Sequence, residues 1–270
     1  MADACFCKAD VGPVIVIKNA LGSTGIFVSQ LGLGTVKFGR NQGVKYPEQF
    51  TLPTDQEIRS LLSFAKELGI NLLDTAPAYG TSEERLGKLL TNRHDWIICG
   101  KAGEEFINGE SHFDFSAEAI AQSVERSLRR LHTDYLDIVL IHSDGNDLEN
   151  IEKFAVFDTL KRLKEKGLIR AFGMSTKTVE GGLLAVEHSD VVMVTYNVLQ
   201  TEERPVIVSA HEKQKGVLIK KALASGHLQK ISDEDPVKKS MDFIFGEQGV
   251  SSVIVGTLNQ KHLEQNVRCV

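Results

Sequence analysis

Four polar residues follow apolar runs that are typical of buried strands. Asp74 closes "NLLD", Tyr79 follows five residues later, Lys101 closes "IICGK" and His142 closes "IVLIH". A phenol, with a reference pKa near ~10, is a poor proton donor at neutral pH unless a cation stabilises its anion. A lysine ammonium ~4 Å away, at an effective dielectric constant near 20, would favour the phenolate by roughly 4 kcal/mol. The four residues therefore predict a general acid, Tyr79, tuned by Lys101 and Asp74, with a neutral His142 donating a hydrogen bond to a substrate oxygen. Hydride delivery to a carbonyl is the reaction that requires such an acid.

Apolar runs and helical patterns alternate along almost the whole chain, and this alternation predicts how the four residues meet. The strand-like runs are short and nearly continuous in apolar residues, as in parallel sheets that are buried on both faces. Eight strand–helix units in about 250 residues predict a closed (β/α)8 barrel, a TIM barrel, in which chemistry gathers at the carboxyl ends of the strands. The predicted strands are 28–35, 70–76, 96–103, 136–144, 169–176, 190–199, 217–223 and 251–257. The predicted helices are 53–69, 82–90, 116–131, 151–167, 178–188, 203–216, 235–249 and 259–267.

A doubly wound open sheet is the competing architecture. It would require a glycine-rich phosphate loop after its first strand, and "LGLGTVKFG" lacks the complete G-x-G-x-x-G spacing. Residues 12–30 read as two short strands around a glycine-containing turn, which predicts a hairpin over the bottom of the barrel. The 37–53 segment is long for a strand–helix connection and is therefore a candidate functional loop. We expect residues 1–270 to form a single barrel domain.

Helix starts are marked by capping residues, and these fix several element boundaries. Thr54 with Glu57, Ser82 with the acids beside it, and Ser116 with Glu118 are predicted to begin three of the helices.

Composition excludes several classes of partner. The chain has 270 residues, 42% of them hydrophobic, and a formal net charge of −5, so a basic surface for nucleic acid or for an anionic membrane is not expected. No apolar run approaches the ~18 residues of a membrane span, and "MADACFCKADVG" has no signal-peptide pattern. We expect a cytoplasmic protein, monomeric or weakly homo-oligomeric. Cys5, Cys7, Cys99 and Cys269 are expected to be reduced thiols, with Cys99 in the core, and no metal site is predicted.

Several segments resemble the aldo-keto reductases. The most specific are "LLDTAPAYGTSEERLGKLL" and "SVERSLRRLHTDYLDIVLIHSD"; "GKAG", "KEKGLIRAFGMST" and "VIVGTLNQKHLEQN" add to them, and the resemblance covers residues 21 to 266. It implies that Asp74, Tyr79, Lys101 and His142 form the family's catalytic tetrad. It also implies reduction of aldehydes or ketones to alcohols by hydride transfer from a nicotinamide cofactor, with NADP(H) expected and NAD(H) as the alternative.

The same resemblance implies where the cofactor lies. Thr35 and Val36 would be near the nicotinamide, Ser175 at its carboxamide, Leu223 and Ser225 at the pyrophosphate, and the segment from Gly256 at the adenosine. The full set of implied cofactor-binding residues is Thr35, Val36, Ser175, Thr176, Lys220, Lys221, Leu223, Ser225, Gly256, Thr257, Leu258, His262, Gln265 and Asn266.

Four positions depart from the family pattern. Thr176 stands where the family has an asparagine, and Met193 aligns with a glutamine that often holds the carboxamide. Lys220 falls at or near the position of the aromatic residue that stacks under the nicotinamide, and His262 aligns with a basic residue for the 2′-phosphate. These departures concern how the cofactor is held, whereas the four catalytic positions match the pattern.

Other interpretations of the same residues stay open. A buried Asp–Lys pair is often only structural. A Schiff-base lyase would also use a lysine at a strand end, Lys101, but would need it neutral. A nicotinamide-binding sensor or regulatory protein with little turnover is another alternative on this fold. A metal-dependent hydrolase is not expected because no H-x-H pair ends a strand, while His112 and Phe113, after the third strand, are candidates for the substrate pocket.

Overall fold

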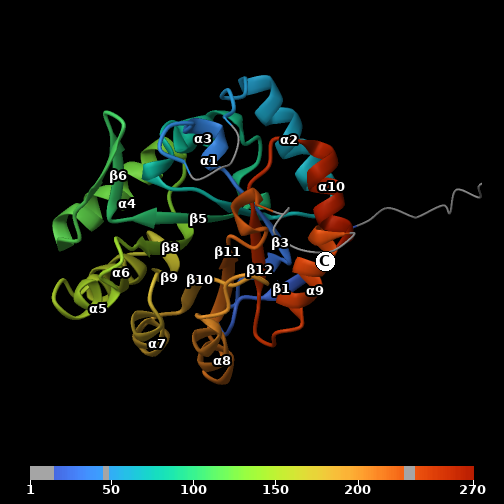
Figure 1. Cartoon of the computed structure of the whole chain (residues 1–270). Helices are drawn as coiled ribbons and strands as arrows, with labels where there is room; N and C mark the ends of the chain where they lie inside the picture. The colour runs from blue at the N-terminus through green and yellow to red at the C-terminus, as the bar shows by residue number, and fades with distance from the viewer. Residues whose placement is uncertain (1–14, 45–48, 228–234) are drawn as a thin grey trace, which may run out of the picture.

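Eight parallel strands close into a barrel, as the sequence predicts (Figure 1). The computed structural model describes residues 15–44, 49–227 and 235–270. Around the barrel the strands follow one another in chain order, and β12 pairs with β3 to close it. The barrel strands are β3 (Leu31–Gly34), β4 (Leu72–Asp74), β5 (Ile97–Ala102), β8 (Leu136–His142), β9 (Ile169–Ser175), β10 (Val191–Thr195), β11 (Gly216–Lys220) and β12 (Ser252–Val255).

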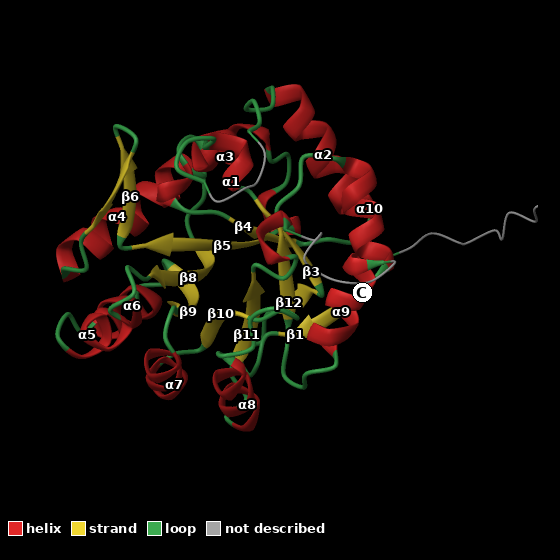
Figure 2. Cartoon of the chain, in the orientation of Figure 1, coloured by secondary structure: helices red, strands yellow, loops and turns green. Residues whose placement is uncertain are grey.

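Helices surround the strands on the outside of the barrel (Figure 2). Helix α4, for example, packs an apolar stripe of Ile120, Val124 and Leu128 toward the sheet. The α-helices are α1 (Val36–Gly39), α2 (Asp55–Glu67), α3 (Ser82–Leu89), α4 (Ala117–Arg130), α5 (Asp147–Glu152), α6 (Val156–Glu165), α7 (Val179–His188), α8 (Arg204–Glu212), α9 (Pro236–Phe245) and α10 (Gln260–Arg268). Three 3-10 turns are η1 (Pro77–Tyr79), η2 (Arg93–Asp95) and η3 (Ala224–Gly226).

Two of the three predicted helix caps are present. Thr54 and Glu57 form a reciprocal capping box at α2, and Ser116 accepts a hydrogen bond from Ala119 N at α4. The prediction for Ser82 was wrong, because α3 begins at Ser82 itself and its hydroxyl is buried. It instead donates to Thr35 Oγ1 at 2.8 Å, which ties α3 to the end of β3.

A hairpin of β1 (Lys18–Ala20) and β2 (Phe27–Ser29) closes the bottom of the barrel, as predicted. Leu21, Ile26 and Val28 are buried in a cluster with barrel-interior residues, Cys99 among them. At Gly22, with φ +54°, a Cβ would lie 2.5 Å from Gly216 N, where β11 begins. Only glycine tolerates both that conformation and that approach.

Several predicted elements differ from the observed ones in their bounds, and one predicted helix is broken in two. The helix predicted over 151–167 is divided, because Ala155 adopts a left-handed conformation (φ 49°) between α5 and α6. At the break, Phe154 packs against Phe115, with ring centroids 6.1 Å apart. The sixth barrel strand is also shorter than predicted, since β10 ends at Thr195.

A second hairpin, not predicted, follows β5 at the top of the barrel. It consists of β6 (Glu104–Ile107) and β7 (Glu110–Phe113) and stands beside α4 (Figure 1). Its two-residue turn has Asn108 at φ 54° and Gly109 at φ 89°. Positive φ at both positions is the requirement of the tight hairpin turn that the Asn–Gly pair favours.

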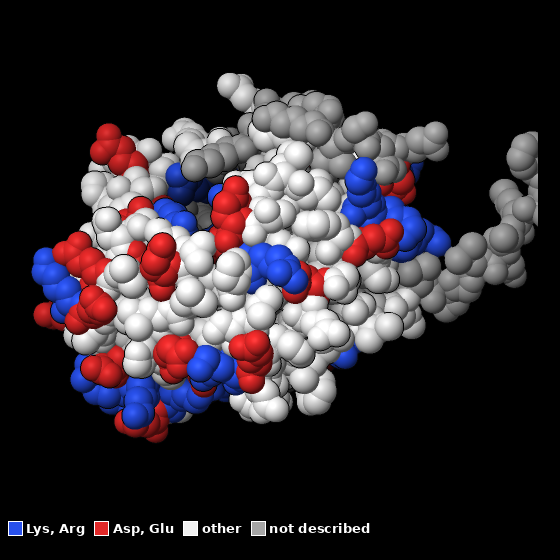
Figure 3. All heavy atoms as spheres, turned by 60° about the horizontal axis from the view of Figure 1, so that its bottom comes forward, with Lys and Arg blue, Asp and Glu red and all other residues white. Residues whose placement is uncertain are grey.

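The described surface carries charges of both signs. On the face seen in Figure 3, basic and acidic side chains are interspersed among the described residues. Within the described ranges, no helix is long and apolar enough to span a bilayer. Cys5 and Cys7 lie outside the described ranges. Since residues 1–14 as a whole lie outside them, the single domain over residues 1–270 stays a prediction.

Candidate active site

Three of the four predicted catalytic side chains are in direct contact at the carboxyl end of the barrel. Lys101 Nζ forms a short ion pair with Asp74 Oδ1 and donates a hydrogen bond to Thr75 O at 3.2 Å. The Tyr79 hydroxyl donates a long hydrogen bond, 3.4 Å, to the other oxygen of Asp74. Lys101 Nζ also lies 5.1 Å from the centroid of the Tyr79 ring. The phenol therefore sits next to a buried ion pair.

Burial strengthens the electrostatic effect of this ion pair on its neighbours. The Lys101 side chain is 2% exposed and that of Asp74 is 6% exposed. Burial disfavours a charged lysine, but Asp74, together with Tyr79 and Cys99, outweighs that penalty and holds the pKa of Lys101 well above its ordinary value. A permanently charged ammonium is what a tuner of Tyr79 needs, and it argues against Lys101 as the neutral amine of a Schiff-base lyase.

His142 completes the group. Its ring lies edge-on to Tyr79, with centroids 6.2 Å apart and an interplanar angle of 85°. Burial lowers the pKa of His142, Glu104 opposes that shift, and the cations Lys101 and Lys220 add to it. The imidazole is therefore held toward its neutral form.

Glu104 is a site residue that sequence reasoning missed. It begins β6, and its Oε2 lies 2.7 Å from His142 Nδ1, although off the direction of a linear hydrogen bond. Its Oε1 accepts a hydrogen bond from Ser111 Oγ at 2.6 Å. Burial would raise the pKa of Glu104, but the contacts with His142, Ser111 and Arg40 outweigh it and lower that pKa to about 2. The signal that could have found this residue is the Asn108–Gly109 pair, which predicts a hairpin immediately after the third barrel strand.

Thr35 lies beneath the tetrad rather than open to a ligand. It is fully buried, and its Oγ1 donates to Asp74 O at 2.9 Å while accepting from Ser82. Ser82 also lies within 3.2 Å of Thr75 Oγ1. This network fixes the backbone on either side of Asp74. Val36, the other residue expected near the nicotinamide, begins α1.

Ser175, Thr176 and Lys220 are brought together at the ends of β9 and β11. Lys220 Nζ donates to Ser175 Oγ at 2.9 Å and to Thr176 O through a short contact. Thr176 Oγ1 in turn donates to Glu203 at 2.8 Å, a buried carboxylate that sequence reasoning also missed. Burial lowers the pKa of Lys220 to about 8, with Glu203 opposing and Lys221 and Lys177 adding to the shift. No sequence pattern marked Glu203, because it precedes α8 in an ordinary polar turn.

Met193 is almost fully buried among apolar residues of the barrel interior. Because a methionine side chain has no amide, it cannot make the hydrogen bond to a carboxamide that a glutamine at this position would make.

The loops after β11 and β12 carry the remaining expected cofactor residues. Lys221, Ala224 and Ser225 all have positive φ, at 57°, 47° and 56°. Non-glycine residues in this conformation are uncommon and concentrate at ligand-binding loops. Leu223 lies between them, and Gly226 continues the positive φ at 92°.

The N-terminus of α10 fits an anionic ligand. Asn259 caps this helix through Lys261 N, and Thr257 Oγ1 accepts from Asn259 N at 3.1 Å. Lys261, His262 and Gln265 are exposed beside the helix start, whereas Asn266 is buried. Backbone N–H groups and the positive end of a helix suit phosphate oxygens, so these residues fit the phosphorylated half of a nicotinamide cofactor.

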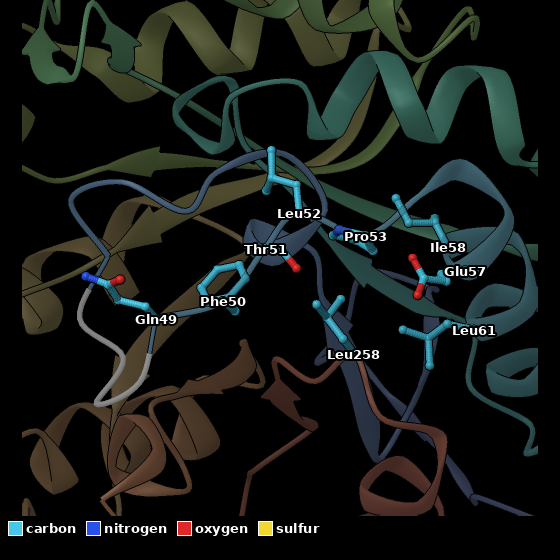
Figure 4. Close-up of a pocket in the computed structure, with 9 residues that line it drawn as sticks. All are labelled: Gln49, Phe50, Thr51, Leu52, Pro53, Glu57, Ile58, Leu61 and Leu258. Atoms are coloured by element: carbon cyan, nitrogen blue, oxygen red, sulfur yellow. The ribbon is translucent and has the colours of Figure 1, made fainter.

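Leu258 also lines a pocket of about 500 Å³ (Figure 4). Its other walls are the 49–53 segment, which belongs to the long loop after β3, and the first turns of α2. None of the four catalytic candidates lines this pocket.

The two substrate-pocket candidates lie on opposite faces of the β6–β7 hairpin. Phe113 pairs with Glu104 and shares its face, while His112 pairs with Glu105. Glu105 contacts Arg126 of α4, so His112 is on the side of the hairpin away from His142. Within the described ranges, no group of three or more His, Cys, Asp or Glu side chains could hold a metal ion.

Comparison with known proteins agrees with this fold. The model of the aldo/keto reductase family matches residues 30–242, and the chain belongs to that family of oxidoreductases. The crystal structure of PA4992, described as an aldo-keto reductase from Pseudomonas aeruginosa, is 52% identical with a TM-score of 0.85, and the match covers 93% of each chain.

Two curated relatives are more distant. The oxidoreductase YqkF of Bacillus subtilis is 28% identical over 93% of this chain and 90% of its own length. L-galactose dehydrogenase of Arabidopsis thaliana is 28% identical over 93% of this chain and 87% of its own length.

Proposed function

We propose that the protein reduces aldehydes or ketones to alcohols by hydride transfer from NADPH, with Tyr79 as the general acid. The observation that carries the proposal is the buried Asp74–Lys101 ion pair in contact with the Tyr79 phenol. A buried cation beside a phenol stabilises the phenolate that remains after proton donation.

A nicotinamide cofactor, when bound, would supply the hydride that adds to the carbonyl carbon while the C=O π electron pair moves onto oxygen. Tyr79 donates its hydroxyl proton to that oxygen, so an alcohol forms and a phenolate remains. Lys101 stabilises the phenolate, Asp74 keeps Lys101 charged and aimed, and His142 orients the substrate oxygen. Solvent returns the proton to Tyr79 before the next turnover.

The residues proposed to hold the cofactor surround this group. Ser175, which pairs with His142 in the sheet register, and Lys220, which is hydrogen-bonded to Ser175, offer polar atoms to the nicotinamide end. Backbone N–H groups for the phosphates come from the loop that contains Leu223 and Ser225 and from the capped start of α10. Lys261 at the start of α10 adds a positive charge. The positive φ angles of Lys221, Ala224 and Ser225 in that loop support a ligand-binding role.

The names of two relatives make oxidation, the reverse of the proposed reduction, relevant as well. L-galactose dehydrogenase and the D-arabinose 1-dehydrogenase of Saccharomyces cerevisiae are named for alcohol oxidation. The same four residues run in reverse, with the Tyr79 phenolate as base, would serve that direction.

The experiment is a panel of aldehydes, ketones, sugars and the matching alcohols, followed by nicotinamide absorbance with NADPH, NADH, NADP+ and NAD+. We expect multiple turnovers with at least one carbonyl compound and a phosphorylated cofactor. Tight cofactor binding without turnover on any substrate would favour the sensor alternative.

A cytoplasmic location and a monomeric or weakly oligomeric state also stay predictions.

A further inference from the structure

One carboxylate oxygen of Glu104 lies close to Nδ1 of His142, although off the direction of a linear hydrogen bond. Glu104 pairs with Phe113 and Ser111 pairs with Phe106, so all four share the hairpin face that looks toward the barrel mouth. Ser111 Oγ donates to Glu104 Oε1 at 2.6 Å and holds that oxygen. The other oxygen, Oε2, lies 2.7 Å from His142 Nδ1. The hairpin therefore anchors a carboxylate against the imidazole.

The charged groups around this pair differ in what they favour. Lys101 of β5 and Lys220 of β11 are the cations that act on His142, and both oppose a positive charge on its ring. Arg40 acts on Glu104 from the other side, stacked on Phe106 with its guanidinium carbon 3.5 Å from the ring centroid. Arg40 therefore helps to keep Glu104 ionised, and an ionised carboxylate next to Nδ1 favours a proton on that nitrogen.

We propose that Glu104 is a positioning residue that holds the proton of His142 on Nδ1, so that His142 donates to a carbonyl oxygen only when its ring carries a second proton. The tautomer of a neutral imidazole is set by the partner of its other nitrogen. A carboxylate accepts hydrogen bonds and donates none, so it pairs with Nδ1–H and leaves Nε2 bare. The expectation of a neutral histidine that donates to the substrate thus changes to a cationic donor.

The consequence for catalysis, which rests on the proposed function, differs between the two directions. A protonated His142 donates from Nε2–H to the oxygen of a carbonyl substrate. A neutral His142 presents the Nε2 lone pair, which accepts a hydrogen bond from the hydroxyl of an alcohol substrate. Acid therefore favours carbonyl reduction and higher pH favours alcohol oxidation through this one residue. Burial, with Lys101 and Lys220, lowers the pKa of His142, so the switch between the two forms of the ring falls at a pH below the ordinary pKa of histidine.

The direct test is nitrogen NMR of the cofactor-free protein with ¹⁵N-labelled histidine. The His142 signals are assigned by their loss in His142→Gln. At a pH where the ring is neutral, we expect Nδ1 to be protonated and Nε2 to be bare. A neutral ring with its proton on Nε2 would overturn the proposal. This measurement needs neither cofactor nor substrate, so it is independent of whether the protein proves to be a reductase.

Substitution then tests the cause. In Glu104→Gln, Ser111 can keep donating to the amide oxygen while the amide NH2 faces Nδ1, so we expect the proton to move to Nε2; the equivalent change beside a catalytic histidine elsewhere gives the wrong tautomer. Glu105→Gln is the matched control, because Glu105 faces α4 and should leave the His142 signals unchanged. An unchanged tautomer in Glu104→Gln would contradict the proposal.

The pH profile provides the functional readout. For the parent, the rate of carbonyl reduction should bend at the His142 titration midpoint measured by NMR, falling about tenfold per pH unit above it. Glu104→Gln should lack that bend, because its neutral ring carries Nε2–H. A bend that persists in Glu104→Gln would show that the carboxylate does not control the proton.

Discussion

Breaking the Asp74–Lys101 pair tests the electrostatics of the site most severely. Lys101→Met removes the ammonium and leaves Asp74 as a buried carboxylate that has lost its cation and still accepts the 3.4 Å bond from Tyr79. Removing one partner of a buried pair typically costs about 3–5 kcal/mol. Because domains have free energies of unfolding of about 5–15 kcal/mol, that is a large part of the total. The loss should appear in urea unfolding at pH 7 as a fall in the transition midpoint.

Two variants make this prediction sharp. Lys66→Met breaks a surface pair with Asp95, whose side chains are 55% and 31% exposed, and should cost at most about 1 kcal/mol. Asp74→Asn combined with Lys101→Met removes both charges and should recover most of the stability that Lys101→Met alone loses. A cost for Lys101→Met no greater than that of Lys66→Met would refute the account of a buried, mutually dependent ion pair.

Two further predictions concern the cofactor. Lys220, proposed to lie beside the nicotinamide, should disfavour the positively charged oxidised ring while the lysine is charged. Burial lowers the pKa of Lys220 to about 8, so binding of the oxidised relative to the reduced cofactor should strengthen from pH 7 to pH 9. Lys220→Met should abolish that change in the ratio of dissociation constants, and a ratio in the parent that ignores pH would contradict the placement. His262→Arg should raise the preference for NADPH over NADH, because a charge-assisted bond to the 2′-phosphate contributes about 1.5–3 kcal/mol, or roughly 10- to 150-fold. An unaltered preference would show that His262 does not lie at that phosphate.

The barrel could be predicted because its periodicity is set by local rules. Each strand is a short apolar run, each helix begins at a polar cap or ends near a glycine, and the eightfold count leaves few architectures. The positions of Asp74, Lys101 and His142 followed from the same reasoning, since parallel strands of a barrel end at one mouth. These residues are close together because their strands β4, β5 and β8 are neighbours in the barrel, in the same order as in the chain.

What could not be predicted depends on contacts between loops. Glu104 reaches His142 only because Asn108 and Gly109 fold the loop back as a hairpin; the Asn–Gly pair marks the turn, but not which side chain the hairpin brings to His142. Ser82 looked like a cap, but the 2.8 Å bond to Thr35 uses its hydroxyl elsewhere. Ala155 interrupts a helix whose apolar spacing continues across the break, so periodicity alone did not reveal it.

The most direct test of the central claim is the rate of carbonyl reduction by Tyr79→Phe, measured beside the dissociation constant of NADPH. The substitution removes the phenolic oxygen and keeps the ring against His142 and Lys101. The account predicts a loss of about 10²- to 10⁴-fold in kcat with cofactor binding nearly unchanged, as expected when a general acid is lost. A Tyr79→Phe enzyme that reduces the same substrate within a few-fold of the parent rate would contradict it.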